Sequence, residues 1–180
     1  NISSTKNDED LSSQQEPPVT SEIVVKEKSI TTPVTIVPVK PVSDMTEEEL
    51  VGQLKITNEP ELLIEAVNRL GAISKISDKS IDQLKGFIGK KNTDVDAYLI
   101  KALSKKATNR DDVLSDFILI LKTSNNRVIK RCAADAIGEF KNAKQKLTEL
   151  NSILEIETDE RVKLKLNQTI RSINDPAIAK

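Results

Sequence analysis

Residues 126–140 read NRVIKRCAADAIGEF, and the apolar residues of this stretch recur at helical spacing. Ile129, Ala133 and Ile137 lie four residues apart, which places them on one face of an α-helix. Asn126, at the start of the stretch, is a residue type that favours the N-cap. The stretch therefore predicts a helix with one apolar face and one polar face.

The same pattern returns along the chain at a nearly constant step. One column of apolar residues is spaced by 33, 34 and 33 residues, and a second column by 34, 33 and 33 residues. The columns are Leu70, Leu103, Ile137 and Ile170, and Leu54, Ile88, Leu121 and Leu154. A period of this length is typical of solenoids, in which each helical hairpin buries its apolar face against the next. The sequence thus predicts an all-α fold, a right-handed α-solenoid of about four hairpins.

Helix start signals divide each repeat into two helices. Thr46 and Glu49 have the spacing of a capping box, and Pro60 suits the first turn of a helix, where a backbone N–H has no partner. The other first helices are expected to begin near Ser77, Arg110 and Lys144, and the other second helices near Thr93, Asn126 and Thr158.

Residues 126–140 resemble the second helix of a HEAT repeat, with its polar cap and its Ala-Ala-x-Ala-Leu-Gly core. Residues 58–73, which end in Arg-Leu-Gly-Ala-Ile, are similar. The other two units depart from the pattern, because Ser104 and Arg171 stand where the Gly is usual. The resemblance spans about 130 residues and implies a HEAT-like array with a scaffolding role.

The composition of the chain changes near residue 43. Residues 1–43 hold five of the seven Pro and have no Gly and no aromatic residue, so they predict an extended or disordered arm. Residues 44–175 are expected to form the HEAT-like domain, and residues 176–180 its C-terminal end. The arm is either a spacer or a docking segment that enters a groove or extends a sheet of a partner. Its candidate docking residues are Val34, Ile36, Val37 and Val39.

Charge and hydropathy narrow the range of partners. A formal net charge of −1 gives no bulk attraction to nucleic acid, and no run approaches the ~18 apolar residues of a membrane span. We expect protein partners, with neither nucleic-acid binding nor membrane insertion. The chain begins at Asn1 without a signal-peptide pattern. We favour a processed exported form, periplasmic or envelope-associated, over a cytoplasmic one.

Catalytic and metal-binding residue types are scarce. HEAT-like di-iron hydroxylases use His-Glu pairs, and this chain has no His; HEAT-like base-excision enzymes use a basic face with aromatic contacts, and it has no Trp. The single cysteine, Cys132, follows no catalytic pattern and is expected to be a small, semi-buried helix residue. We expect no catalytic residue, metal or cofactor. The alternative is a small lyase or chromophore-handling enzyme of the HEAT-like bilin lyase type.

In solenoids of this kind the second helices line the concave side, and their non-core positions form ladders from repeat to repeat. The candidate binding residues on these ladders are Glu65, Asn68, Tyr98, Lys101, Lys105, Asp135, Glu139, Lys165 and Gln168. The mixed charges suit a protein partner, and Tyr98 is the best single anchor because aromatic side chains contribute strongly at interfaces. An ordinary solvated helix face remains the other interpretation. The sequence predicts a non-enzymatic interaction scaffold or adaptor, one subunit of a hetero-assembly.

Overall fold

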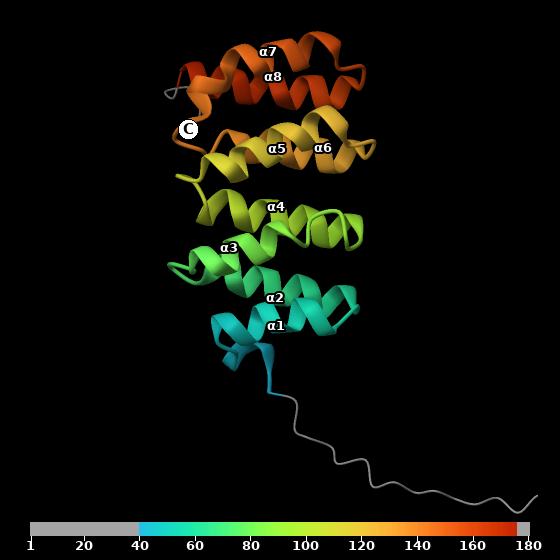
Figure 1. Cartoon of the computed structure of the whole chain (residues 1–180). Coiled ribbons are helices and arrows are strands. Elements are labelled where there is room, and N and C mark those ends of the chain that lie inside the picture. Colours follow the sequence, from blue (N-terminus) through green and yellow to red (C-terminus); the bar gives the residue numbers. More distant parts are fainter. Residues whose placement is uncertain (1–39, 176–180) are drawn as a thin grey trace, which may run out of the picture. The chain divides into compact units, whose positions relative to one another are not determined.

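The computed structural model describes residues 40–175, which are helical and contain no strand (Figure 1). The α-helices are α1 (Glu47–Ile56), α2 (Pro60–Ala72), α3 (Asp78–Lys85), α4 (Thr93–Lys106), α5 (Asp111–Thr123), α6 (Arg127–Ile137), α7 (Leu147–Ile156) and α8 (Glu160–Asn174). The same residues also contain two short 3₁₀ helices, η1 (Val42–Asp44) and η2 (Ala143–Lys146). The all-α prediction is confirmed for this part of the chain. The candidate docking residues Val34, Ile36, Val37 and Val39 lie outside the described residues, as do residues 176–180.

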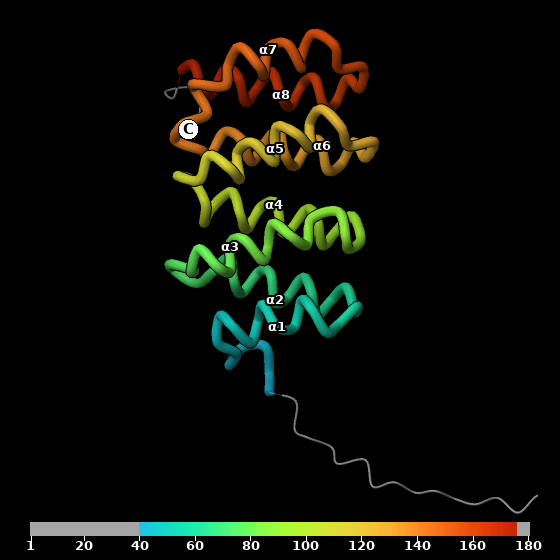
Figure 2. Tube along the Cα trace, viewed as in Figure 1, coloured from blue at the N-terminus to red at the C-terminus, as the bar shows by residue number. Residues whose placement is uncertain are grey.

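The helices are arranged in pairs that follow one another in chain order. Each of α1, α3, α5 and α7 contacts the helix that comes next in the chain. In addition, α2 contacts α4, α4 contacts α6, and α6 contacts α8. The tube in Figure 2 shows this order as a steady change of colour from α1 and α2 to α7 and α8. The second helices therefore form one continuous row.

Polar contacts show that the helices of this row run in the same direction. They join the start of one helix to the start of the next, and the end of one to the end of the next. The contacts at the starts are Asn126 Nδ2 to Thr93 Oγ1 at 2.9 Å and Lys130 Nζ to Glu157 Oε2 at 2.7 Å. The contacts at the ends are Lys106 Nζ to the Ile73 carbonyl and the Lys141 N–H to the Thr108 carbonyl at 3.0 Å. Residues that are one period apart in the sequence therefore lie at the same level along the axes of neighbouring helices.

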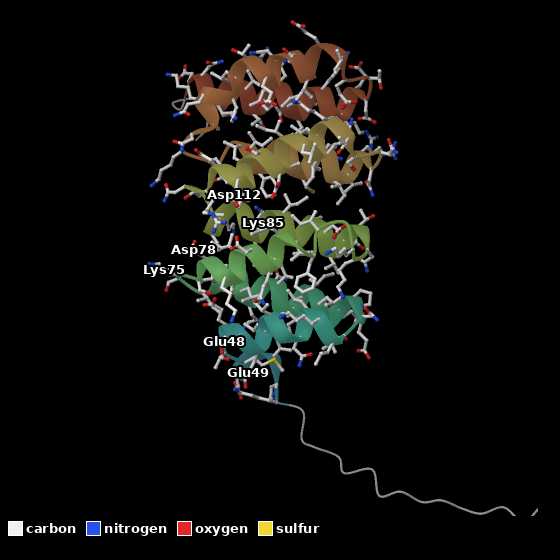
Figure 3. All side chains as sticks on the ribbon, in the orientation of Figure 1. Glu48, Glu49, Lys75, Asp78, Lys85 and Asp112 are labelled. Atoms are coloured by element: carbon white, nitrogen blue, oxygen red, sulfur yellow. The ribbon has the colours of Figure 1, made fainter. Side chains whose placement is uncertain are left out.

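The first helices are linked by charged side chains. Lys85 of α3 donates to Asp112 of α5 at 2.6 Å, and Figure 3 shows these two side chains pointing toward each other. Arg110, the N-cap residue of α5, reaches back to Asp78 at 3.1 Å and to Asp82 at 2.6 Å. These pairs connect α3 to α5 at the surface.

One apolar cluster runs through all the pairs, and the two sequence columns supply much of it. Leu70, Leu103 and Ile137 are fully buried, and Ile170 is nearly so. Ile88 was expected on a helix, and this is wrong: α3 ends at Lys85, and Ile88 lies in the turn that follows. The reason is local: after the C-cap residue Gly86, the N–H groups of Phe87 and Ile88 donate to carbonyls three residues back, at 3.1 and 3.2 Å. Gly89, with a φ of 79°, then turns the chain toward the start of α4.

Most helix starts are those that the sequence predicts. The capping box is present: Thr46 Oγ1 accepts from the Glu49 N–H at 3.3 Å, and Glu49 Oε2 accepts from the Thr46 N–H at 2.6 Å. Pro60 opens α2. The seventh helix differs, since the region near Lys144 forms η2 and α7 begins at Leu147.

Ordered contacts of the helical unit begin before residue 44. Lys40 pairs with Glu49 at 2.8 Å, and the Arg69 guanidinium donates to the carbonyl of Ser43. Val42 of η1 packs half-buried against the core. Residues 40–43 are thus attached to the helices by their own contacts.

Candidate functional site

The largest concentration of predicted site residues lies in an open cleft between α4 and α6, with a volume of about 420 Å³. We call it the α4–α6 cleft. Its principal side chains are Tyr98, Lys101 and Lys105 on one side and Cys132, Asp135 and Glu139 on the other. The structure thus brings five of the nine predicted helix residues together in a single hollow.

Core packing decides which side chains of α4 face the cleft. Val95, Leu99 and Leu103 are fully buried, which sets the rotation of the helix about its axis. Tyr98 and Lys101 follow these core positions at helical spacing on the neighbouring face, where Tyr98 is half-buried and Lys101 exposed. Tyr98 is therefore the more buried and Lys101 the more exposed residue of this wall.

The same logic applies to α6. Ala133 and Ile137 are fully buried, so Cys132 and Asp135 face the cleft. Glu139 follows Gly138, the C-cap residue of the helix, and also lines the cleft. The small side chains of this helix leave the space that the cleft occupies. The spacing of the buried residues along α4 and α6 therefore determines which side chains form the two walls of the cleft.

The two walls carry opposite charge. Lys101 and Lys105 are on the α4 wall, and Asp135 and Glu139 are on the α6 wall. Asp135 Oδ1 accepts from Lys165 Nζ of α8 at 2.9 Å, yet the Asp135 side chain remains 69% exposed. Within residues 40–175, the side chains of Lys101, Lys105 and Glu139 form no hydrogen bond or ion pair. These charges are free to pair with groups on another molecule.

Cys132 is the cleft residue with nucleophilic chemistry, and its surroundings suppress that chemistry. Burial raises the pKa of the Cys132 thiol, and the charge of Asp135 adds to this effect, while Arg131 and Lys165 oppose it. The thiolate is the reactive form of cysteine, so a raised pKa keeps this thiol protonated at neutral pH. Cys132 contributes apolar surface to the cleft.

Two smaller hollows continue the cleft along the row. One, of about 200 Å³ between α2 and α4, adds Asn68 and shares Tyr98, Lys101 and Lys105 with the α4–α6 cleft. The other, of about 280 Å³ between α6 and α8, contains Lys165 and Gln168. Glu65 is exposed on α2 and lines none of these three hollows. We call the exposed side of α2, α4, α6 and α8 that carries these hollows the second-helix face.

The structure adds residues to this face that the sequence analysis did not select. Arg131, Arg161 and Leu164 line the hollow between α6 and α8, and Leu164 is 61% exposed. Arg131 and Leu164 are 33 residues apart, so they occupy the same position in successive repeats. The period that identified the other ladders could have found both residues.

A further hollow, of about 750 Å³, lies at the starts of α6 and α8, but its charged side chains Lys130 and Glu157 already pair with each other. Glu157 accepts from Lys130 at 2.7 Å and from the N–H groups of Thr158 and Asp159 at 2.9 and 3.0 Å. This arrangement holds the turn before α8 against α6. It is a structural contact.

No group of three or more His, Cys, Asp or Glu side chains within residues 40–175 is arranged to hold a metal ion. In the same part of the chain, every helix is too short or too polar to cross a membrane. Comparison of the chain with protein-family models, with curated proteins and with solved structures finds no match.

Proposed function

We propose that the helical unit is a right-handed HEAT-like solenoid of four hairpins that serves as a non-enzymatic interaction scaffold, binding another protein on the second-helix face. In this proposal the protein is one component of a larger assembly. The observation that carries the proposal is the pair of adjoining hollows that share Tyr98, Lys101 and Lys105.

The chemistry of these hollows suits a protein surface. Tyr98 offers an aromatic ring that is already half-buried, so little side-chain freedom is lost when a partner covers it. Around it lie charges of both signs without internal partners, which favour one orientation of a bound partner over others. The thiol with a raised pKa and the absence of His argue for binding over catalysis.

A photo-crosslinking experiment tests this proposal. Tyr98 is replaced by p-benzoyl-phenylalanine, an aromatic photoreactive residue, and Leu119 is replaced in a matched control. Leu119 is 56% exposed and belongs to α5, a first helix. We expect irradiation in an extract of the source cells to give a discrete product with another protein from position 98 and none from position 119.

Charge reversal makes the test specific. We expect the variant Lys101→Glu/Lys105→Glu to lose the position-98 product, because the proposed partner is oriented by these charges. Identical products from positions 98 and 119, or no product from position 98, would contradict the proposal.

The N-terminal arm has a proposed role as a second contact. Its Val and Ile residues favour extended structure, which suits docking along a partner. Deletion of residues 1–39 leaves the contacts of Lys40 and Ser43 in place. We expect this deletion to reduce the yield of the position-98 product. An unchanged yield would show that the arm does not contact the partner and acts as a spacer.

A further inference from the structure

The charges of the second-helix face are arranged in a mirrored order across the α4–α6 cleft. Sets of equivalent residues are spaced by 33, 34 and 33 positions and come from α2, α4, α6 and α8, except that Glu139 lies in the turn after α6. The sets are Glu61, Asp94, Val128 and Arg161; Ile64, Ala97, Arg131 and Leu164; Glu65, Tyr98, Cys132 and Lys165; Asn68, Lys101, Asp135 and Gln168; and Ala72, Lys105, Glu139 and Ser172.

Within each set, the outer two residues form one mirrored pair and the inner two form another. Four of these pairs join opposite charges and none joins like charges. The four pairs are Glu61 with Arg161, Glu65 with Lys165, Lys101 with Asp135, and Lys105 with Glu139. A fifth pair is apolar and joins Ile64 with Leu164. The face is therefore electrostatically complementary to a rotated copy of itself.

A two-fold axis gives this complementarity a physical meaning. The four helices run in the same direction, so a two-fold axis can lie parallel to them and over the α4–α6 cleft. Rotation about this axis keeps the direction of the helices and turns the second-helix faces of the two copies toward each other. Such an axis sets α4 against α6 of the second copy, and α2 against α8 of the second copy, with equivalent residues at the same height. We infer that a second copy of this chain binds on the second-helix face through this isologous contact.

The inner contacts would lie around the two facing clefts. Lys101 and Lys105 would face the Asp135 and Glu139 side chains of the second copy, twice by symmetry. Lys101, Lys105 and Glu139 make no side-chain hydrogen bond or ion pair within residues 40–175, and Asp135 keeps 69% of its side chain exposed beside Lys165. Tyr98 and Cys132 of both copies would line the cavity that the two facing clefts enclose, which shields the half-buried ring from bulk water.

The outer contacts supply an apolar element. Leu164 is a strongly exposed leucine on this face, and its mirrored position is Ile64, which is half-buried on α2. Covering Leu164 with Ile64 of the second copy removes apolar surface from water. Exposed ion pairs contribute little affinity individually, so we assign the charges mainly to orientation and the apolar contacts to affinity.

This inference rests on the proposed function in using the same face, and the two are separable by experiment. The full chain is studied by sedimentation equilibrium over a wide range of concentration. Two charge-reversed variants are compared with it: Lys101→Glu/Lys105→Glu and Asp135→Lys/Glu139→Lys. Each variant alone places like charges across the axis, and we expect its dimer to be weaker than the wild-type dimer by about tenfold or more.

The mixture of the two variants is the decisive sample. Its members carry opposite charges at every inner contact, so we expect a heterodimer of roughly wild-type affinity. The combined variant with all four changes should form a homodimer again. The matched control is Lys55→Glu/Lys79→Glu, which reverses two exposed lysines of first helices and changes the net charge equally. We expect the control to leave the dimer unchanged.

A wild-type chain that remains monomeric at all concentrations would overturn the inference, and so would a mixture that stays monomeric. In either case a position-98 crosslink to a different protein still supports the proposed scaffold function. Conversely, a dimer with the expected charge dependence and no such crosslink supports self-association and overturns binding of a different protein on this face.

Discussion

Asp96 in the first turn of α4 is a buried acid with one hydrogen-bond partner. It is 6% exposed, and its Oδ1 accepts from the Gly89 N–H at 3.1 Å. Burial raises the pKa of Asp96, and the hydrogen bond from Gly89 opposes this in part. The folded protein thus holds the proton more tightly than the unfolded chain, so stability is lost as the pH rises through the raised pKa.

We expect Asp96→Asn to be more stable than the wild type at neutral pH, because it keeps an acceptor for Gly89 and removes the buried charge. Urea denaturation at neutral pH and below pH ~3.5, where the wild-type acid is protonated, checks this. The difference should vanish at the lower pH. Asp96→Ala leaves the Gly89 N–H without its acceptor and should be less stable than Asp96→Asn by about 1 kcal/mol. An Asn variant no more stable than wild type at neutral pH would contradict this account.

The pKa of Glu157, another buried acid, is shifted in the opposite direction from that of Asp96. Burial opposes its ionisation and is the largest single influence, but the N–H groups of Asp159 and Thr158 and the ammonium group of Lys130 together outweigh it. The pKa of Glu157 is therefore lowered. A lowered pKa contributes stability above the ordinary value of a glutamate, and this contribution disappears as the pH falls through the folded-state pKa.

We expect Glu157→Gln to reduce the free energy of unfolding at neutral pH by about 1–3 kcal/mol, since Lys130 loses its counter-charge in a site only 18% exposed. The loss should shrink in acid, as measured by urea denaturation at neutral pH and below pH ~3.5. Lys130→Met/Glu157→Gln is the control for the pair, and it should recover part of the loss. A loss of the same size at both pH values would show that the charge of Glu157 is not its cause.

At the scale of the element, two glycines have opposite roles. Gly71 lies inside α2, where an added Cβ would meet Ala102 Cβ at 3.7 Å, an ordinary van der Waals contact. Gly89 has a φ of 79° in the turn between α3 and α4. We expect Gly71→Ala to raise the free energy of unfolding by up to about 1 kcal/mol, through helix propensity. Gly89→Ala should lower it by about 1–2 kcal/mol, because L-residues avoid this backbone region.

Thermal denaturation of the two variants, followed by circular dichroism, measures both effects under the same conditions. Each is a Gly to Ala change, so each variant serves as the control for the other. Destabilisation by Gly71→Ala would mean that α2 and α4 approach too closely for a methyl group. Stabilisation by Gly89→Ala would mean that the turn accepts another conformation.

At the scale of the whole helical unit, a single apolar cluster implies that the helices unfold together. Phe117 of α5 is fully buried and meets Phe140 edge to face, with ring centroids 5.6 Å apart. Phe117→Leu should lower the free energy of unfolding by about 1–2 kcal/mol, through lost packing and lost ring contact. Tyr98 is the only tyrosine, and the chain has no tryptophan, so its fluorescence reports on α4.

We expect the urea midpoint from Tyr98 fluorescence and the midpoint from circular dichroism to shift by the same amount in the Phe117 variant. Leu119→Ala, on the exposed side of the same helix, is the control and should move neither midpoint appreciably. If the fluorescence midpoint stays fixed while the dichroism midpoint moves, α4 unfolds independently of α5.

The spacing of apolar residues in the sequence predicted the structure correctly where burial depends on neighbouring residues of the same helix. It predicted the helices, the buried column of Leu70, Leu103, Ile137 and Ile170, and the capping box at Thr46. In the second column Leu54 and Leu121 are buried, whereas Ile88 and Leu154 are half-buried. The spacing failed at Ile88, because the helix ends at Lys85 and tighter turns follow its C-cap residue, Gly86. It also left Leu164 out of the candidate face, although this leucine is 61% exposed in the structure.

The sequence by itself determined the all-helical character of residues 40–175, most helix starts and the spacing of the second-helix ladders, because these follow from local hydrogen bonding and from which residues avoid water. Only the tertiary structure decided that α2, α4, α6 and α8 contact one another in order and run in the same direction. It also decided that Tyr98, Lys101 and Lys105 meet Cys132, Asp135 and Glu139 in one cleft. Contacts between residues some 30 positions apart depend on how whole helices pack, and a linear pattern does not contain that information.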